Sequence, residues 1–398
     1  MDAEKSLAAR VPGLDGLAVR LGFSEPVYVT RPALPSLGDY TRLLEGVWDR
    51  RWLTNDGELH QRLEAALQEH LGVRHVSLFC NGTLSLLVAL QALDLGGGEV
   101  VTTPFTFPAT TNVLHWNRLE PVFCDIDPAT FNIDPGRVAA AITPRTKAIL
   151  AVHVYGIPCD VEALEAIGNR HGIPVIYDAA HAFGVRVDGR SVLGWGAVSS
   201  LSFHATKLFT TAEGGALACS DPALDRRIRS LKNFGIADEE TVLAPGINAK
   251  MSELQAAFGL LRLPETAGES AARGRVAGVY RDGLAGVPGL TLPAPPPRVT
   301  PNHAYFPLLV DGAEFGLDRD GLYTALRRFN VVARKYFYPL TSTHEWNREL
   351  PSAAPENLPV ANRTAGRVLC LPVYGSLALE DAARIVEIIR VLHGAARS

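Results

Sequence analysis

The chain has 398 residues, of which 47% are hydrophobic and 20% charged, so it is globular and too long for one ordinary core, and two domains are expected. Its net charge of -4 gives no indication of a nucleic-acid partner, and no run of about eighteen apolar residues or signal-peptide pattern suggests a membrane span or export. The five cysteines are scattered without a C-x-x-C pair, which argues against a disulfide framework or a metal site and fits a cytoplasmic protein.

From Val73 to Cys219, short apolar runs alternate with patterns of helical period. The expected strands are 73–79, 99–104, 120–127, 147–156, 198–204 and 214–220, with one more at 173–184 that runs into a turn. The expected helices are 84–93, 134–142, with Asp134 as the N-cap, and 160–172. This alternation predicts an α/β fold with a mostly parallel sheet that is covered by helices on both faces.

The rest of the chain predicts a second, smaller unit. Helical patterns at 221–235 and 250–263 precede a connection at 291–301, which has four prolines between Pro293 and Pro297. A strand (303–310), a helix (318–329), a strand (331–338) and a final helix (379–393) then follow. The predicted division is an N-terminal extension (1–36), a large domain (37–265) and a small C-terminal α+β domain (266–398).

Two residues fall where a parallel sheet places ligands, at the carboxyl ends of strands. Asp178 ends the apolar run "IPVIYD", and Lys207 ends "SFHATK". A lysine amine that binds the cofactor aldehyde and a carboxylate that keeps a pyridine nitrogen protonated are what pyridoxal phosphate (PLP) requires. Taken alone, Asp178 could equally cap a turn, and a lone lysine is usually a solvated surface charge.

A PLP site also needs a phosphate cradle and an aromatic ring. Asn81, Gly82 and Thr83 precede a predicted helix, whose first N–H groups bind anions, although a plain helix cap explains them as well. Ser202 offers another hydroxyl group. In "TPFTFPATTN", either Phe105 or Phe107 could stack on the cofactor, or both could belong to the core.

The fragments "NGT", "FTFPATTN", "YDAAHAFG", "SFHATK", "EGGAL" and "NAKMSELQAAFG" occur in this order, and "ARKYFYPL" follows later. Together they resemble the sugar aminotransferases of the DegT/StrS family, which are fold-type I PLP enzymes. The similarity runs from about Trp52 to Leu261 and resumes at "ARKYFYPL". It implies a three-layer sandwich with a smaller C-terminal domain.

The resemblance also implies roles for individual residues. Lys207 would form the Schiff base with PLP, Asp178 would pair with the pyridinium nitrogen, and Phe107 would stack on the ring. Ala180 would lie against the other ring face, His181 near the phenolic oxygen, and Gly82, Thr83 and Ser202 around the phosphate. The segment with Asn248 and Lys250 would reach the partner's cofactor in a homodimer with shared active sites, and which of the two touches the phosphate stays open.

The implied reaction is a two-step amino transfer from L-glutamate to a nucleotide-linked keto sugar. Candidates for its diphosphate are Arg334, Lys335 and Lys250, with ordinary solvated charges as the alternative. Tyr336 and Tyr338 could contact the sugar or the base. In "WLTNDG", Thr54, Asn55 and Asp56 form either a turn or a contact with the sugar.

Two fragments indicate, by their similarity to family members, which carbon of the sugar is aminated. "GINAKMSE" and "ARKYFYPL" are more similar to members that aminate dTDP-4-keto-6-deoxyglucose at position 4, because the 3-amino members more often read "GYNYRM". The expected product is dTDP-4-amino-4,6-dideoxyglucose or its 4-epimer, for natural-product or antibiotic biosynthesis, with a 3-aminotransferase as the alternative.

Three other classes of protein fit the sequence less well. A family dehydratase would have histidine in place of Lys207, and a non-catalytic PLP-binding regulator would need a DNA-binding module for which 36 residues are too few. An NAD enzyme would need a G-x-G-x-x-G after a strand, and the sequence has none.

Overall fold

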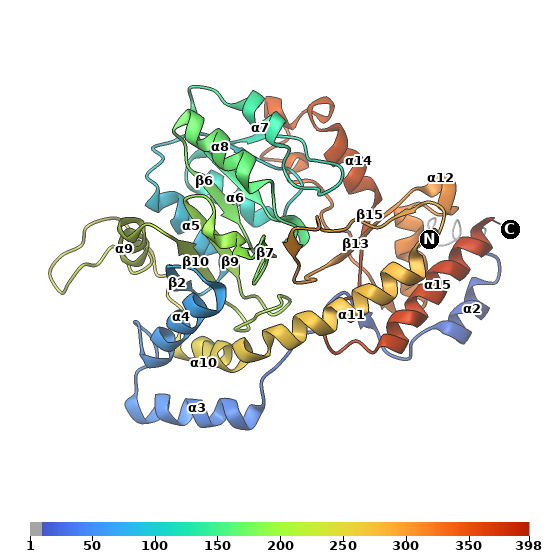
Figure 1. The fold of residues 1–398 in the computed structure, drawn as a ribbon, viewed down its shortest axis with the longest axis horizontal. Coiled ribbons are helices and arrows are strands. Elements are labelled where there is room, and N and C mark those ends of the chain that lie inside the picture. Colours follow the sequence, from blue (N-terminus) through green and yellow to red (C-terminus); the bar gives the residue numbers. More distant parts are fainter. Residues whose placement is uncertain (1–9, 398) are drawn as a thin grey trace.

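The computed structural model describes residues 10–397, and Figure 1 shows a large domain beside a smaller one, with helix α11 (Thr266–Leu284) running between them. The large domain is built on a seven-stranded sheet in the order β2-β10-β9-β6-β5-β3-β4. Its strands are β2 (His75–Phe79), β3 (Gly98–Thr102), β4 (Leu119–Phe123), β5 (Thr146–Val152), β6 (Val175–Asp178), β9 (Val198–Ser202) and β10 (Gly215–Cys219). Only β10 runs antiparallel to its neighbours in this sheet, so the predicted mostly parallel α/β sheet is confirmed.

The two faces of the sheet bury separate cores, because successive side chains of a strand point to opposite sides. On β5, Ile149 and Ala151 belong to one core cluster, and Ala148 and Leu150 to the other. The first face is covered by α3 (Leu37–Arg50), α4 (Glu58–Leu71), α7 (Pro135–Ala141), α8 (Val161–His171) and α10 (Glu253–Arg262). The second is covered by α5 (Gly82–Ala92), α6 (Pro108–Trp116) and α9 (Pro222–Leu231). These layers form the expected three-layer sandwich.

Side-chain caps fix where several of these helices begin. Asp134 accepts a hydrogen bond from the backbone N–H of Arg137 (2.9 Å) at the start of α7, as predicted. Asn81 does the same for Leu84 (2.9 Å) at the start of α5. The cap therefore sets the first turn of α5 directly beyond the end of β2.

The small domain packs α11 and three further helices around a sheet in the order β11-β13-β15, while α14 belongs to a core cluster that also contains large-domain residues. Its elements are β11 (Leu290–Thr291), β13 (Phe306–Val310), β15 (Val368–Leu371), α12 (Gly312–Phe315), α13 (Arg319–Arg328), α14 (Pro359–Arg367) and α15 (Leu379–Arg397). The predicted strand 331–338 is shorter, because β14 covers only Val331–Val332. Arg334 still pairs with Cys370 in an isolated bridge, and the chain then turns so that Tyr336 and Phe337 line a cavity.

The described part of the N-terminal extension packs on the small domain. Helix α2 (Leu14–Leu21) buries Leu14 and Leu21 in the small-domain core, and β1 (Val27–Tyr28) pairs in parallel with β14. Residues 1–9 of the predicted extension lie outside the described residues. From β1 the chain passes to α3 on the large domain, so residues 10–36 link the two domains.

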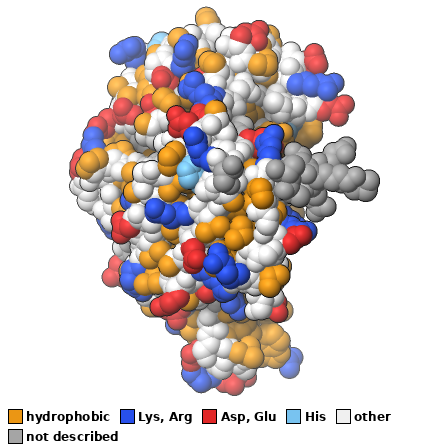
Figure 2. Space-filling model, turned by 90° about the vertical axis from the view of Figure 1, so that its right-hand side faces the viewer, with side chains coloured by type: hydrophobic (Ala, Val, Ile, Leu, Met, Phe, Trp, Pro, Cys, Tyr) orange, Lys and Arg blue, Asp and Glu red, His pale blue; other side chains and the backbone are white. Residues whose placement is uncertain are grey.

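The surface carries no strong charge bias on the face that Figure 2 shows, where acidic and basic side chains are interspersed with apolar ones. This distribution agrees with the small net charge of -4. Within residues 10–397, no helix combines the length and apolarity needed to cross a membrane.

Candidate active site

Neighbouring strands carry Asp178 and Lys207 to the same edge of the sheet. Asp178 is the last residue of β6, and Lys207 follows the adjacent parallel strand β9 after a short turn closed by the hydrogen bond from its N–H to the His204 carbonyl (2.9 Å). Both side chains line one cavity of about 700 Å³. The structure thus brings together the two residues that the strand-end argument singled out.

Asp178 is buried and held at both oxygens. Thr110 Oγ1 donates to Oδ2 (2.8 Å), and the Ala180 N–H donates to Oδ1 (3.1 Å). Burial raises the pKa of the Asp178 carboxyl, while the two hydrogen bonds and the charge of Lys207 oppose the rise. A buried, oriented carboxylate of this kind is suited to a cationic ring N–H.

The Lys207 amine lies in the same low-dielectric cavity. Burial lowers its pKa to about 8, against the opposing effects of Asp178 and Tyr336. Nζ donates a hydrogen bond to Tyr305 Oη (3.3 Å). Close to neutral pH, part of the Lys207 amine is therefore unprotonated. The unprotonated amine is the form that attacks a carbonyl carbon or accepts a proton.

An anion cradle faces this amine at the start of α5, where Gly82, Thr83 and Ser202 line the cavity. The first N–H groups of a helix have no partner inside the helix and point outward. The cradle requires close backbone packing, since a Cβ on Gly82 would lie 3.0 Å from Ser202 Cβ. A Cβ on Gly215, at the start of β10, would lie 2.7 Å from the carbonyl carbon of Asn81.

The two candidate phenylalanines lie in different environments. Phe107, the N-cap residue of α6, is 56% exposed and lines the cavity, whereas Phe105 is fully buried in an aromatic cluster with Phe131 and Tyr155. Phe107 alone of the pair can offer a ring face to a ligand. Phe105 belongs to the core.

His181 and Ala180 also line the cavity. The His181 ring stacks on Phe337 with a centroid distance of 5.6 Å, and its Nδ1 accepts a hydrogen bond from the Tyr155 N–H (3.3 Å). Burial, followed by the charge of Lys207, lowers the pKa of His181 well below its usual range. The imidazole is therefore neutral and has Nε2 left for a ligand.

Of the four predicted substrate contacts at residues 334–338, only Tyr336 lines the cavity. Lys335 pairs with Asp320 (2.5 Å) on α13, and Tyr338 lies under the guanidinium of Arg319. Arg334 is exposed and does not line the cavity. Burial raises the pKa of Tyr336, and the charge of Arg334 opposes this rise. Lys207 is the only lysine or arginine in the cavity wall formed by the described residues.

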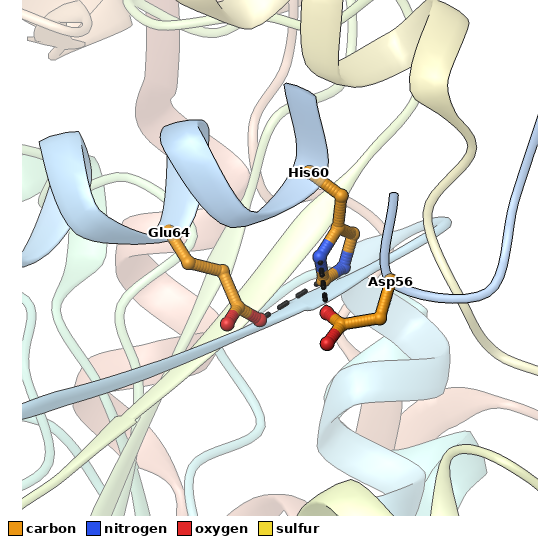
Figure 3. Close-up of side chains that lie close together, drawn as sticks. All are labelled: Asp56, His60 and Glu64. Carbon is orange, nitrogen blue, oxygen red and sulfur yellow. Dashed lines mark ion pairs between the residues drawn. The ribbon is translucent and has the colours of Figure 1, made fainter. Parts of the chain in front are cut away.

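The "WLTNDG" segment forms a turn in which Asn55 and Asp56 adopt left-handed backbone angles (φ 59° and 60°) and Thr54 is exposed. Figure 3 shows that Asp56 faces His60 on α4, with 2.9 Å between Oδ1 and Nδ1. Neither Thr54 nor Asp56 lines the cavity of its own chain.

Glu64 completes the side-chain group of Figure 3, and its Oε1 lies 3.8 Å from His60 Nε2. Arg229 (2.7 Å) and Lys232 (3.4 Å) also pair with Glu64. Two cations already neutralise this carboxylate, so the group is an ion-pair network rather than a cation site.

Asn248 and Lys250 lie outside the cavity of their own chain, although Lys250 Nζ donates to Asn248 Oδ1 (2.7 Å). The backbone carbonyl of Ala249, between them, accepts a hydrogen bond from the Cys80 N–H (2.9 Å), beside the start of the cradle. The loop before this segment projects from the large domain beside α9 in Figure 1.

Sequence reasoning missed two groups at the site. Thr110, which holds Asp178, stands one helical turn after Phe107 in "FPATTN", and the helical period of that fragment was the available signal. Tyr305, the residue directly before the small-domain strand β13, contacts Lys207, and nothing in its local sequence marks it.

The group of side chains fits PLP. It offers an amine for the aldehyde, a buried carboxylate for the pyridinium nitrogen, an aromatic face at Phe107 and a helix N-terminus with hydroxyl groups for the phosphate.

Comparisons with known proteins point to the same chemistry. Residues 38–390 match the model of the DegT/DnrJ/EryC1/StrS aminotransferase family. The chain is 47% identical over 362 residues to the dTDP-4-amino-4,6-dideoxy-D-glucose transaminase of Escherichia coli (91% of this chain and 97% of that protein). It is 45% identical over 368 residues to the transaminase of the same name from Shigella dysenteriae (92% and 99%). The crystal structure of DesI in the presence of its TDP-sugar product is similar with a TM-score of 0.89, 38% identity and 94% of both chains covered.

Proposed function

The chain belongs to the DegT/DnrJ/EryC1/StrS aminotransferase family, and on this premise we propose that it transfers an amino group from L-glutamate to dTDP-4-keto-6-deoxy-D-glucose. The product is dTDP-4-amino-4,6-dideoxyglucose. The members of this family and the named relatives are PLP-dependent sugar transaminases. The observation that carries the proposal is the buried Lys207 amine, which shares a cavity with a buried, hydrogen-bonded Asp178.

When bound, PLP supplies an aldehyde that takes up the amino group and a ring that draws electrons from the reacting carbon. Lys207 holds the cofactor covalently, and its released Nζ then takes and returns the proton that moves during transfer. A pKa near 8 suits both tasks, because the amine gains and loses a proton readily near neutral pH.

The oriented Asp178 carboxylate would keep the ring nitrogen protonated, and Thr110 and the Ala180 N–H fix that orientation. His181 would donate from Nε2 to the phenolic oxygen of the cofactor, because its Nδ1 is already an acceptor. Phe107 and Ala180 line the cavity where they would hold the two faces of the ring, and the start of α5 with Ser202 would bind the phosphate.

The two substrates use the cavity in turn, glutamate first and the keto sugar second. Tyr336 lies in the cavity wall and is placed to contact the sugar. Arg334 lies outside that wall next to Tyr336, where it is available to a diphosphate that extends out of the cavity. Lys335 and Tyr338 are turned toward α13 and are assigned no substrate contact.

The cavity of one chain has a deficit of positive charge, and we propose that a second copy supplies it. Among the described residues of the cavity wall, Lys207 is the only lysine or arginine. The cavity must nevertheless accept two anionic substrates and a phosphate. The projecting loop before Asn248 exposes apolar side chains, Phe234, Ile236, Val242 and Leu243. A homodimer that covers these side chains would carry Asn248 and Lys250 to the partner's phosphate cradle.

Coexpression of two inactive variants tests this sharing. One chain carries Lys207→Ala, and the other carries Asn248→Ala with Lys250→Ala. In a mixed dimer one site has both an intact Lys207 and an intact Asn248–Lys250 pair, so about one quarter of the wild-type activity is expected from random pairing. If the mixed dimer is as inactive as each parent, the sites are not shared.

The reaction itself is tested by incubating the PLP-loaded protein with L-glutamate and dTDP-4-keto-6-deoxyglucose. Mass spectrometry and proton NMR should show a 4-amino sugar, and the coupling constants at C4 should give the orientation of the amine. A protein that binds PLP through Lys207 but forms an amino sugar only from a 3-keto substrate would overturn the assignment of position 4.

We further propose a cytoplasmic location for this enzyme. All five cysteines are free in the structure, and four of them are buried, which fits a reducing compartment. Activity in the soluble cytoplasmic fraction of the producing cell is the expected result.

A further inference from the structure

Tyr305 is a polar partner of the Lys207 amine on the side of the small domain. Its phenolic oxygen lies 3.3 Å from Nζ, and its ring lies 5.8 Å below the same nitrogen. The ring also packs edge-on against His181 (4.8 Å between centroids) and against Tyr336 (5.7 Å). Tyr305 therefore stands between the lysine and two further residues of the cavity wall.

The segment before Tyr305 is fastened to the large domain. Asn302 is buried, and its Nδ2 donates to the carbonyls of His181 (2.8 Å) and Phe183 (3.0 Å). Its Oδ1 accepts a hydrogen bond from the Ala304 N–H (3.1 Å). These bonds fix residues 302–304 directly before Tyr305, so the position of the phenol does not depend on its contact with Lys207 alone.

The phenol keeps its proton throughout the working pH range. Burial raises the pKa of Tyr305 far above that of the lysine, so Tyr305 does not serve as a base. A neutral hydroxyl remains an acceptor for an amine N–H. The other groups that face Nζ are the Asp178 carboxylate, the Tyr336 phenol and the neutral His181 ring.

A released lysine needs such a partner. Its four-carbon chain has many conformations, and the reacting amine must return to one position for each proton transfer. Within the described residues, Tyr305 is the one side chain to which Nζ donates a hydrogen bond.

We propose that Tyr305 is a catalytic residue whose phenolic oxygen receives the Lys207 amine whenever that amine is not covalently engaged, and so holds it where the proton is transferred. The role in transfer rests on the aminotransferase function proposed above, whereas the hydrogen bond to Lys207 can be tested without any substrate. A failure of the substrate assignment and a failure of this inference are therefore distinguishable.

The test compares the wild type with Tyr305→Phe, which removes only the hydroxyl group. The rate of PLP uptake by the apoprotein, followed in the visible spectrum over a pH series, reports the fraction of neutral Lys207 amine. The wild type should show a midpoint near pH 8. The Phe variant should shift it down by roughly half to one pH unit, because a hydrogen bond to a charged group is about twice as strong as one to a neutral group.

In turnover, the Phe variant should lose about tenfold or more in kcat with KM nearly unchanged, the pattern of an interaction needed for the chemical step. Tyr323→Phe on α13, which removes a surface phenol that accepts from Arg327, is the matched control and should behave as wild type in both assays. Tyr305→His, which returns a polar atom to the ring, should restore part of the midpoint shift and provides the test if the Phe variant does not fold.

Two results would overturn the proposal. One is a midpoint and a kcat within error of wild type in a folded Tyr305→Phe protein. The other is uptake that slows equally at every pH together with a lower Tm, because this pattern shows a structural role only. The pH midpoint of PLP uptake tests the role of Tyr305 even if no keto sugar proves to be a substrate.

Discussion

Replacing Gly215 with alanine should damage cofactor binding although residue 215 lies outside the cavity wall. A Cβ at this position would lie 2.7 Å from the Asn81 carbonyl carbon and from the Gly82 nitrogen, and ordinary contact begins at 3.4 Å. The backbone of the cradle must therefore retreat by about 0.7 Å, the difference between these two distances. Binding groups need to be placed within about 0.5 Å of their working positions, so this displacement is large enough to weaken the phosphate contacts.

The expected size of the effect follows from the cost of overpacking. Extra methyl groups in well-packed regions cost about 1–3 kcal/mol. If this cost falls on cofactor binding, the Kd for PLP rises by roughly 5- to 150-fold. The Kd is measured by titrating the apoprotein with PLP and following the visible absorbance.

Gly366→Ala is the control, because a Cβ at this position of α14 meets nothing within 4 Å. The Tm of each apoprotein shows whether the fold is retained. A folded Gly215→Ala protein with the wild-type Kd for PLP would refute the argument that this glycine is required for the position of the cradle.

Two further changes follow from the hydrogen bonds of the site and of the large domain. Thr110→Val removes a hydrogen bond that lowers the pKa of Asp178, so that pKa should rise further and the acid limb of the kcat/KM profile should move to higher pH; an unmoved limb contradicts the assigned role of Thr110. Glu253→Gln should lower the free energy of unfolding by about 1–3 kcal/mol, since the buried carboxylate accepts from the Leu59 and His60 N–H groups (3.1 and 2.8 Å) at the start of α4. Urea denaturation measures the loss, and exposed Glu314→Gln should show none.

The positions of Asp178 and Lys207 could be predicted from the sequence, because Asp178 ends one apolar strand, Lys207 closely follows another, and parallel strands end at one edge. The sequence was also sufficient for the layers of the large domain, where apolar runs and helical periods alternate. The fragment "TPFTFPATTN" by itself left Phe105 and Phe107 as alternatives, and only the family resemblance implied Phe107, since both stand in the same fragment and only the turn into α6 separates their environments.

Contacts between distant parts of the chain were beyond sequence reasoning. Tyr305 meets Lys207 across 98 residues, and a single tyrosine in a strand pattern gives no sign of such a contact. Residues 331–338 were predicted as a strand, but the chain turns after Arg334, so neighbouring side chains diverge: Tyr336 lines the cavity while Lys335 pairs with Asp320.

The packing of α2 and β1 on the small domain has a consequence for the order in which the chain folds. Leu14 and Val27 share a core cluster with Val331 and Ile389, which are synthesised more than 300 residues later. The large domain can fold during synthesis, whereas the core of the small domain forms only when α2 and β1 contact the segments that are synthesised after the large domain. Apolar residues near the N-terminus stay exposed throughout that interval, so truncations at either end should reduce the yield of folded protein.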